Sequence, residues 1–304
     1  MHRPPTAALD SLEGLALGDA FGDRWFSVDA DEAAAAHAAR IPRRAPWHWT
    51  DDTAMAVVLF RHLTRHGEVR PDALARAFAT AYTIQPGRKY GPSMHQVLRA
   101  VHAGADRRTV VEGMFGGQGS HGNGAAMRVA PLGALLADDL DAVAEQAALS
   151  AEATHAHPEA TAGAVAVALA AASAARSRGS RAPERTAFLQ GIADRLPVSD
   201  VRSGLRTAAR FPASTSVRHA AVVLGSGIMI SAQDTVPFAL WCAAGRLDSL
   251  PEALWHTLGG WGDMDTTCAI AGGVVAARTG LTGVPAGWLA ARESLPVPGS
   301  AVFG

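Results

Sequence analysis

The sequence contains very little cysteine. Only Cys242 and Cys268 occur among its 304 residues, far apart and each within an apolar helical pattern. Two such residues argue against a disulfide framework and favour a reducing compartment. We expect both side chains to act as small buried hydrophobic groups.

The sequence also lacks the apolar segments of secreted and membrane proteins. Its N-terminal part carries Asp10, Glu13 and Asp19, so it has no uncharged stretch of a secretory signal. The longest run of low polarity, 160–175, is shorter than the roughly 20 apolar residues that a membrane span requires. We therefore expect a cytoplasmic protein without membrane association, and a central buried helix over 160–175.

An excess of charge of one sign is absent as well. The formal net charge is -1, and the basic residues are scattered singly and in pairs. Without a basic face, nucleic acid is not expected as the main partner. These features favour a small or locally recognised substrate, and we expect a monomer.

No segment alternates apolar and polar residues as a half-buried strand does, and the short Val and Ile runs lie among alanines. With 48% hydrophobic residues, the chain can bury a large core. We predict a compact, multi-helix, all-α fold with one domain over 1–304. The expected helices cover about 6–21, 31–40, 54–66, 71–84, 93–103, 125–137, 141–153, 160–176, 217–230, 236–245, 250–258 and 268–279, with two short helices within 177–215.

Two carboxylates near the C-terminus, Asp263 and Asp265, lie one residue apart and are followed by Thr266 and Thr267. Such hard oxygen donors suit Mg²⁺ or Mn²⁺. The same residue types also cap helix starts, and this motif directly precedes a helical pattern. Alone, the motif therefore leaves both interpretations open.

A second oxygen cluster, Thr50, Asp51 and Asp52, also stands at an expected helix start. Adjacent carboxylates repel one another, and simple capping uses only one of them. A cation would relieve that repulsion. The two clusters together predict a site for divalent metal ions.

The densest glycine stretch is 116–124, which includes Ser120, His121, Gly122, Asn123 and Gly124. Glycines ahead of a helix expose backbone amides that suit a phosphate or diphosphate. The stretch lacks the lysine of a P-loop and a preceding strand, so neither a P-loop nor a dinucleotide fingerprint is predicted. A flexible linker is the alternative interpretation.

Three other residues have two interpretations each. Asp19, between Gly18 and Gly22, is either a buried hydrogen-bonding pillar or part of a metal shell. Tyr90 either stacks on a base or ribose or lies in a surface loop. His155 has no third ligand at zinc spacing, so we expect it to donate hydrogen bonds or position substrate rather than bind metal.

In order and content, these motifs resemble those of the ADP-ribosylglycohydrolases, which include the dinitrogenase-reductase-activating glycohydrolase and eukaryotic ADP-ribosylhydrolases. The resemblance spans nearly the whole chain and is carried by 18–22, 50–53, 122–128, 154–159 and 262–267. It implies an all-α bundle with two Mg²⁺ or Mn²⁺ ions. The implied reaction is hydrolysis of the bond between C1″ of ADP-ribose and an acceptor side chain or related leaving group.

Residue roles follow from the resemblance motif by motif. It implies a metal shell of Thr50, Asp51, Asp52, Asp263, Asp265 and Thr266, with Asp265 bridging the ions. A base toward the attacking water would be Asp51, Asp52 or Asp263. The substrate-binding residues it implies are Asp19, Tyr90, Gly91, Ser120, His121, Gly122, Asn123, Gly124 and His155.

Two positions depart from the family pattern. Phe26 stands where relatives commonly carry a Glu that gates the metal site, and Asp23, Asp29, Asp31 or Glu32 could replace it. The loop 85–89 is basic where relatives that cleave ADP-ribosyl-arginine often have an acid. The linkage, arginine or serine, therefore stays open. The competing hypotheses are a catalytically weakened ADP-ribose-binding relative and a two-metal hydrolase of another ADP-ribosyl or glycosidic small molecule.

Overall fold

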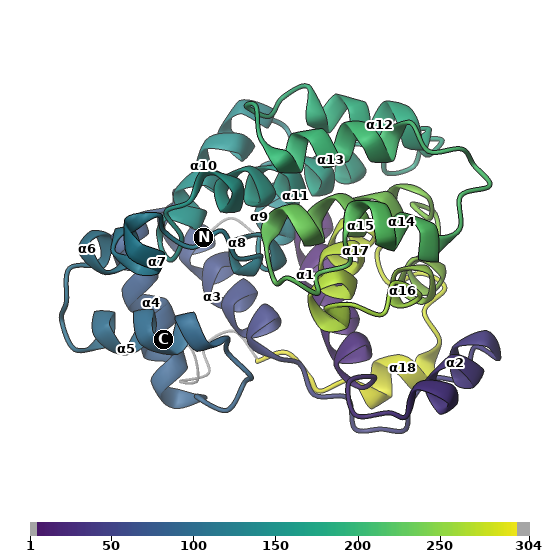
Figure 1. The fold of residues 1–304 in the computed structure, drawn as a ribbon, viewed down its shortest axis with the longest axis horizontal. Coiled ribbons are helices and arrows are strands. Elements are labelled where there is room, and N and C mark those ends of the chain that lie inside the picture. Colours follow the sequence, from purple (N-terminus) through teal and green to yellow (C-terminus); the bar gives the residue numbers. More distant parts are fainter. Residues whose placement is uncertain (1–4, 297–304) are drawn as a thin grey trace.

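The structure, a computed structural model, describes residues 5–296. Within this range the chain forms α-helices and two isolated bridges but no strand, so the predicted all-α fold is confirmed. The helices (Figure 1) are α1 Thr6–Asp23, α2 Ala30–Ala38, α3 Asp51–His66, α4 Pro71–Ile84, α5 Pro92–His102, α6 Arg107–Glu112, α7 Met114–Gly117, α8 Gly124–Met127, α9 Ala130–Leu135, α10 Leu140–Glu152, α11 Pro158–Arg176, α12 Arg185–Ala193, α13 Asp200–Ala209, α14 Val217–Leu224, α15 Ala232–Ala244, α16 Leu250–Leu258, α17 Met264–Thr279 and α18 Ala286–Ala291.

The contact between α1 and α17 brings an N-terminal and a C-terminal helix together at the centre of the fold (Figure 1). Glycines four residues apart on α1 make this contact a backbone one. A Cβ added at Gly18 would lie 2.0 Å from the carbonyl oxygen of Cys268, and one at Gly22 would lie 2.2 Å from that of Met264. Since only glycine permits such an approach, this spacing sets how closely Asp19 approaches the start of α17.

Helix α11 is the central buried helix that the sequence predicts. It is long and apolar enough to cross a membrane by length and composition, but 72% of the relevant window is buried inside the protein. Its neighbours include α9, where a Cβ at Gly133 would meet the carbonyl oxygen of Ala168 at 2.0 Å. Pro158 begins the helix, where its missing N–H costs no hydrogen bond.

The segment 24–50 lies against a cluster of aromatic rings. Phe21 packs on Trp47, Trp255 and Trp288 with ring centroids 5.0–5.7 Å apart. The backbone N–H of Trp47 donates to the carbonyl of Ala291 over 2.8 Å. These contacts hold the end of the long loop in place, so Thr50 arrives beside α1 at the start of α3.

Two expected helices differ from the structure. The helix expected over 125–137 is divided into α8 and α9, with 128–129 outside both helices and Pro131 in the first turn of α9. The helix expected over 217–230 ends at Leu224 because Gly225 has a φ of 87°. Its apolar sequence favours burial on most sides, but Val222, Ile228 and Met229 are exposed.

Candidate active site

Asp19 is a buried pillar that ties α1 to the start of α3. Its carboxylate accepts the backbone N–H of Thr50 at 3.1 and 2.9 Å. It also accepts the N–H of Thr53 at 3.1 Å and its hydroxyl at 2.5 Å. Both oxygens are thus engaged and the residue is inaccessible to solvent. Of the two roles open from the sequence, the structure shows the hydrogen-bonding one.

The two predicted oxygen clusters meet where α3 and α17 begin. Thr50 caps α3 by accepting the N–H of Asp52 at 3.3 Å, and its hydroxyl donates to Oδ2 of Asp52 at 3.1 Å. Asp263 immediately precedes α17, and Asp265 lies in its first turn. A Cβ at Gly22 would lie 2.8 Å from Cα of Asp265, which shows how closely α1 approaches this turn.

Burial and mutual repulsion perturb these carboxyl groups strongly. Burial, with further contributions from Asp19 and Asp263, raises the pKa of Asp51 to about 8. Burial and the neighbouring Asp265 raise the pKa of Asp52 well above its usual value. The pKa of Asp265 is raised likewise, by burial and then by Asp263. Carboxyl groups that raise one another's pKa values share one small volume.

The donor set fits a hard divalent cation. It consists of carboxylate and hydroxyl oxygens, and Oδ1 of Asp52 is buried without a hydrogen-bond partner. A cation would both satisfy this oxygen and offset the repulsion. In the part of the chain that the structure describes, however, no three His, Cys, Asp or Glu side chains are arranged as ligands of one ion. Asp263 instead accepts a hydrogen bond from Asn123 at 2.7 Å.

The glycine-rich stretch lies beside the acidic cluster. Gly122 forms an isolated bridge with Ser231, and the N–H of Asn123 donates to the carbonyl of Ile230 at 3.3 Å. The same 225–231 loop contacts the cluster from its other end, where the N–H of Asp263 donates to the carbonyl of Ser226 at 2.9 Å. Two loops distant in sequence thus border one site.

The predicted diphosphate-binding residues surround His155. A Cβ at Gly122 would lie 3.3 Å from Nε2 of His155, and one at Gly124 would lie 3.2 Å from its Cε1, so the loop passes directly over the ring. Nδ1 of His155 pairs with the Thr154 hydroxyl at 2.7 Å. Burial and then Arg128 lower the pKa of His155 to about 3. The ring is therefore neutral near pH 7.

Ser120 and His121 occupy different environments within the glycine-rich stretch. The Ser120 hydroxyl is buried and accepts the N–H of Gly122 at 3.1 Å. His121 is exposed, and its ring stacks on Phe115 with centroids 6.5 Å apart and planes inclined by 27°. Phe115 is itself exposed and has a φ of 52°.

Tyr90 is buried rather than free in a loop. Its ring is 4% exposed and meets Tyr82 edge-on, with centroids 5.1 Å apart. Burial, followed by the charge of Asp51, raises the pKa of the Tyr90 hydroxyl. Tyr90 therefore lies near the acidic cluster, and Gly91 follows it directly at the start of α5.

The proposed substitutes for the gating Glu separate in the structure. Phe26, in register with that Glu, is 47% exposed. Asp29 caps α2, Glu32 pairs with Arg43 on the surface, and Asp31 is exposed. Only Asp23 lies at the site, where it borders a cavity of 480 Å³ whose lining also includes His48, Trp49, Thr50, Gln85, Gly87, Arg88 and Lys89.

Three parts of the candidate site were not predicted from the sequence. Arg128 is fully buried and donates hydrogen bonds to the carbonyls of Gly124 and Ser150 and to the Thr154 hydroxyl. Burial lowers its pKa to about 9. Phe115 and the 225–231 loop are the others. The sequence features that mark these two are an aromatic residue just before the glycines and a Gly-x-Gly at 225–227.

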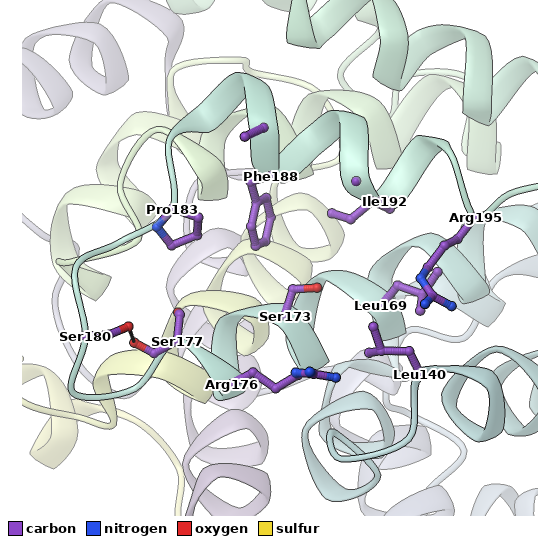
Figure 2. Close-up of a pocket in the computed structure, with 12 residues that line it drawn as sticks. Leu140, Leu169, Ser173, Arg176, Ser177, Ser180, Pro183, Phe188, Ile192 and Arg195 are labelled. Atoms are coloured by element: carbon purple, nitrogen blue, oxygen red, sulfur yellow. Dashed lines mark hydrogen bonds between the residues drawn. The ribbon is translucent and has the colours of Figure 1, made fainter.

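Another cavity, of 530 Å³, lies between α11 and α12 (Figure 2). Its lining includes Ser173, Arg176, Phe188, Ile192 and Arg195 but no carboxylate and none of the predicted site residues. It therefore offers neither metal ligands nor a general base. The acidic cluster with its two bordering loops remains the candidate active site.

Comparison with known proteins agrees with this geometry. The sequence model of the family described as ADP-ribosylglycohydrolase matches residues 3–299. The ADP-ribosylhydrolase ARH3 of Bos taurus is 31% identical over 267 residues, which cover 79% of this chain and 73% of that protein. ARH3 of Homo sapiens is 29% identical over 268 residues, with the same shares covered.

A solved structure described as an ADP-ribosylglycohydrolase-related protein complex is similar in fold. It has a TM-score of 0.62 and 24% identity, and the match covers 94% of this chain and 92% of that one. The sequence match extends over nearly the whole chain and includes every motif of the acidic cluster. The chain belongs to the ADP-ribosylglycohydrolase family.

Proposed function

We propose that the protein hydrolyses the C1″ glycosidic bond of ADP-ribosyl conjugates with two Mg²⁺ or Mn²⁺ ions. Its most direct substrates would be proteins that carry mono-ADP-ribose on arginine or serine. One observation carries the proposal: the Asp51–Asp52 and Asp263–Asp265 pairs converge at two helix starts, and Asn123 of the glycine-rich loop contacts Asp263.

The loops around the cluster suit the rest of ADP-ribose. Backbone amides of the glycine-rich stretch would hold the diphosphate, and neutral His155 beneath the loop would face the distal ribose. The exposed ring of Phe115, stacked on His121, offers a face for the adenine base. Each part of the ligand thus has a chemically matched surface next to the carboxylates.

The chemistry follows from the acidic cluster. When bound, two divalent ions lower the pKa of a coordinated water and hold sugar hydroxyls. Thr50, Asp51, Asp52, Asp263, Asp265 and Thr266 would hold them. Asp51, Asp52 or Asp263 would accept a proton as a water oxygen bonds to C1″. The bond from C1″ to the acceptor atom breaks, its electron pair stays on the acceptor, and that atom takes up a proton.

Release of free ADP-ribose from arginine-, serine- and nucleotide-linked substrates tests the proposal. We expect release from at least one class with Mg²⁺ or Mn²⁺ and none in EDTA. Full activity in EDTA would exclude the metal-dependent mechanism. Tight ADP-ribose binding without turnover would instead support the catalytically weakened binding protein, an alternative that the exposed Phe26 at the expected Glu position favours.

A further inference from the structure

Lys89 is the only lysine in the sequence, and it stands at the 480 Å³ cavity beside Thr50. Its ammonium group pairs with the carboxylate of Asp23, the last residue of α1. The side chain of Asp23 is 8% exposed, whereas that of Lys89 is 58% exposed. Lys89 also has a φ of 64°, a conformation that few residues other than glycine adopt. Asp23 therefore holds the ammonium group of Lys89, while the rest of the side chain is accessible to ligands.

This cavity reaches the acidic cluster from a different side than the glycine-rich loop does. That loop contacts the cluster at Asp263, through Asn123. The cavity instead borders Thr50, and Asp23 follows Gly22, which abuts Asp265. If the loop holds the diphosphate, the cavity is the place for the group attached to C1″.

Asp23 is the carboxylate in the lining of this cavity and already has a cationic partner, as does Glu293, which the lining residue Arg88 binds. Asp23 pairs with Lys89, and Glu293 accepts two hydrogen bonds from Arg88 at 2.7 and 2.8 Å. His48 contacts the same Glu293 at 3.1 Å. The Arg88 guanidinium also lies over the ring of Trp49, 3.4 Å from its centroid. A guanidinium entering the cavity would therefore meet two cations and, among the residues that the structure describes there, no unpaired carboxylate.

We propose that the Lys89–Asp23 ion pair determines which acceptor the enzyme releases: it disfavours ADP-ribose linked to arginine and admits ADP-ribose linked to an uncharged hydroxyl. The inference rests on the proposed function, because it assigns the acceptor side of that site. Lys89 is a specificity-determining residue in this scheme. Asp23 is a positioning residue that holds the ammonium group at the opening.

The ratio of kcat/KM values for two peptides, identical except for ADP-ribose on serine or on arginine, tests the assignment. Wild type should favour the serine-linked peptide. In Lys89→Met, removal of the cation frees Asp23 to receive a guanidinium, so the ratio should shift about tenfold toward the arginine-linked peptide. An additional Asp23→Asn substitution should remove most of that shift. An unchanged ratio in Lys89→Met would overturn the inference.

Arg195→Met is a matched control, because Arg195 is an exposed cation paired with Asp141 beside the other cavity. It should leave the ratio unchanged. Thermal unfolding of each variant separates loss of fold from change of specificity. A general loss of activity on both peptides, without a change in ratio, would assign the ion pair a merely structural role and overturn the proposal.

The single lysine permits a second readout that does not depend on turnover. Acetylation would neutralise Lys89, whereas reductive methylation would retain its charge, and only the α-amino group offers another amine target. A serine-linked ADP-ribosyl peptide should slow acetylation of Lys89, measured by mass spectrometry, more than ADP-ribose alone does. Equal rates with both ligands would place the acceptor elsewhere.

The two readouts distinguish failure of the inference from failure of the proposed function. A wild-type protein that binds both peptides but releases ADP-ribose from neither would contradict the hydrolase proposal. Selective protection of Lys89 by the serine-linked peptide would still support the acceptor assignment. Turnover with an unchanged ratio and no protection would leave the hydrolase proposal intact and refute the role of Lys89.

Discussion

Nδ2 of Asn123 donates a hydrogen bond to Oδ2 of Asp263 over 2.7 Å. This contact connects the glycine-rich loop to the acidic cluster across 140 residues of sequence. The same amide group donates to the hydroxyl of Thr235 at 3.0 Å. Asn123 therefore orients a candidate metal ligand while α15 holds Asn123 itself in place.

Asn123→Ala should lower kcat by about 10–100-fold, because a metal ligand that loses its orienting hydrogen bond is positioned less well. Steady-state kinetics with saturating Mg²⁺ would measure the effect. Thr235→Val, which removes the other acceptor of the amide but keeps the contact with Asp263, is the matched comparison and should lower kcat less. An Asn123→Ala enzyme with wild-type kcat would show that this contact has no role in orienting Asp263.

Gly18→Ala should destabilise the protein by about 3 kcal/mol or more, since the added Cβ would meet the backbone of Cys268 at 2.0 Å and force α1 and α17 apart. Gly191→Ala is the control. Gly191 lies inside α12 with no atom within 4 Å of an added Cβ, and alanine there should stabilise by up to about 1 kcal/mol. Denaturant unfolding measures the change in the free energy of unfolding for each variant. A Gly18→Ala protein as stable as wild type would contradict the close backbone contact.

Asp265→Asn should abolish turnover and leave the protein folded. In protein freed of metal by EDTA it should also raise Tm, because it removes one of several mutually repelling buried carboxylates. Calorimetry with and without Mg²⁺ should show that the cation stabilises wild type but hardly affects the variant. Asp31→Asn, at an exposed position on α2, serves as the control and should change neither turnover nor Tm.

As the pH rises from 6.5 to 8, the free energy of unfolding of the EDTA-treated protein should decrease. In this window the unfolded chain has ionised Asp51, whereas the folded protein, with a pKa of about 8, still holds the proton. Stability therefore decreases as pH rises, by at most about 1.4 kcal/mol per pH unit for each such proton. Saturating Mg²⁺ should flatten the dependence, and unfolding at several pH values would measure it.

Histidines do not reverse this trend in that window. Burial lowers the pKa values of His155 to about 3 and of His62 and His256 to about 4. Their stability contribution therefore increases with pH only up to about pH 6.5, the value of an unperturbed imidazole. A metal-free protein that becomes more stable from pH 6.5 to 8 would contradict the raised pKa of Asp51.

Helices and motifs that depend on local patterns were predictable. The boundaries 71–84 and 250–258 are confirmed, because Pro71 and Ser249 mark starts that the chain defines locally. The break within 125–137 was missed although Pro131 marks it: proline has no N–H that could bond the carbonyl of Met127, four residues earlier, so a new helix begins there. The apolar composition of 217–230 favours burial, whereas of its apolar side chains only Ala220 and Leu224 are buried and Val222, Ile228 and Met229 are exposed.

The convergence of the acidic clusters could be proposed from the sequence, but its physical basis could not. It depends on Asp19, which alone accepts hydrogen bonds from both Thr50 and Thr53, and on glycine contacts between α1 and α17. A linear sequence pattern shows neither the residues that Asp19 binds nor the helix that the glycines of α1 contact. The pairing of Lys89 with Asp23 was likewise hidden, because the two residues are 66 positions apart and α2, α3 and α4 lie between them.

The α1–α17 contact also has a consequence during synthesis. The Ser11 hydroxyl donates to the carbonyl of Gly273 across 262 residues, so α1 cannot dock on its partner until the segment that forms α17 has been made. Loop closure over such a distance makes this docking a late event in folding. Because the two acidic clusters meet only after that docking, a nascent or truncated chain cannot assemble the complete site. Hydrolytic activity would thus be acquired only after α1 has docked on α17.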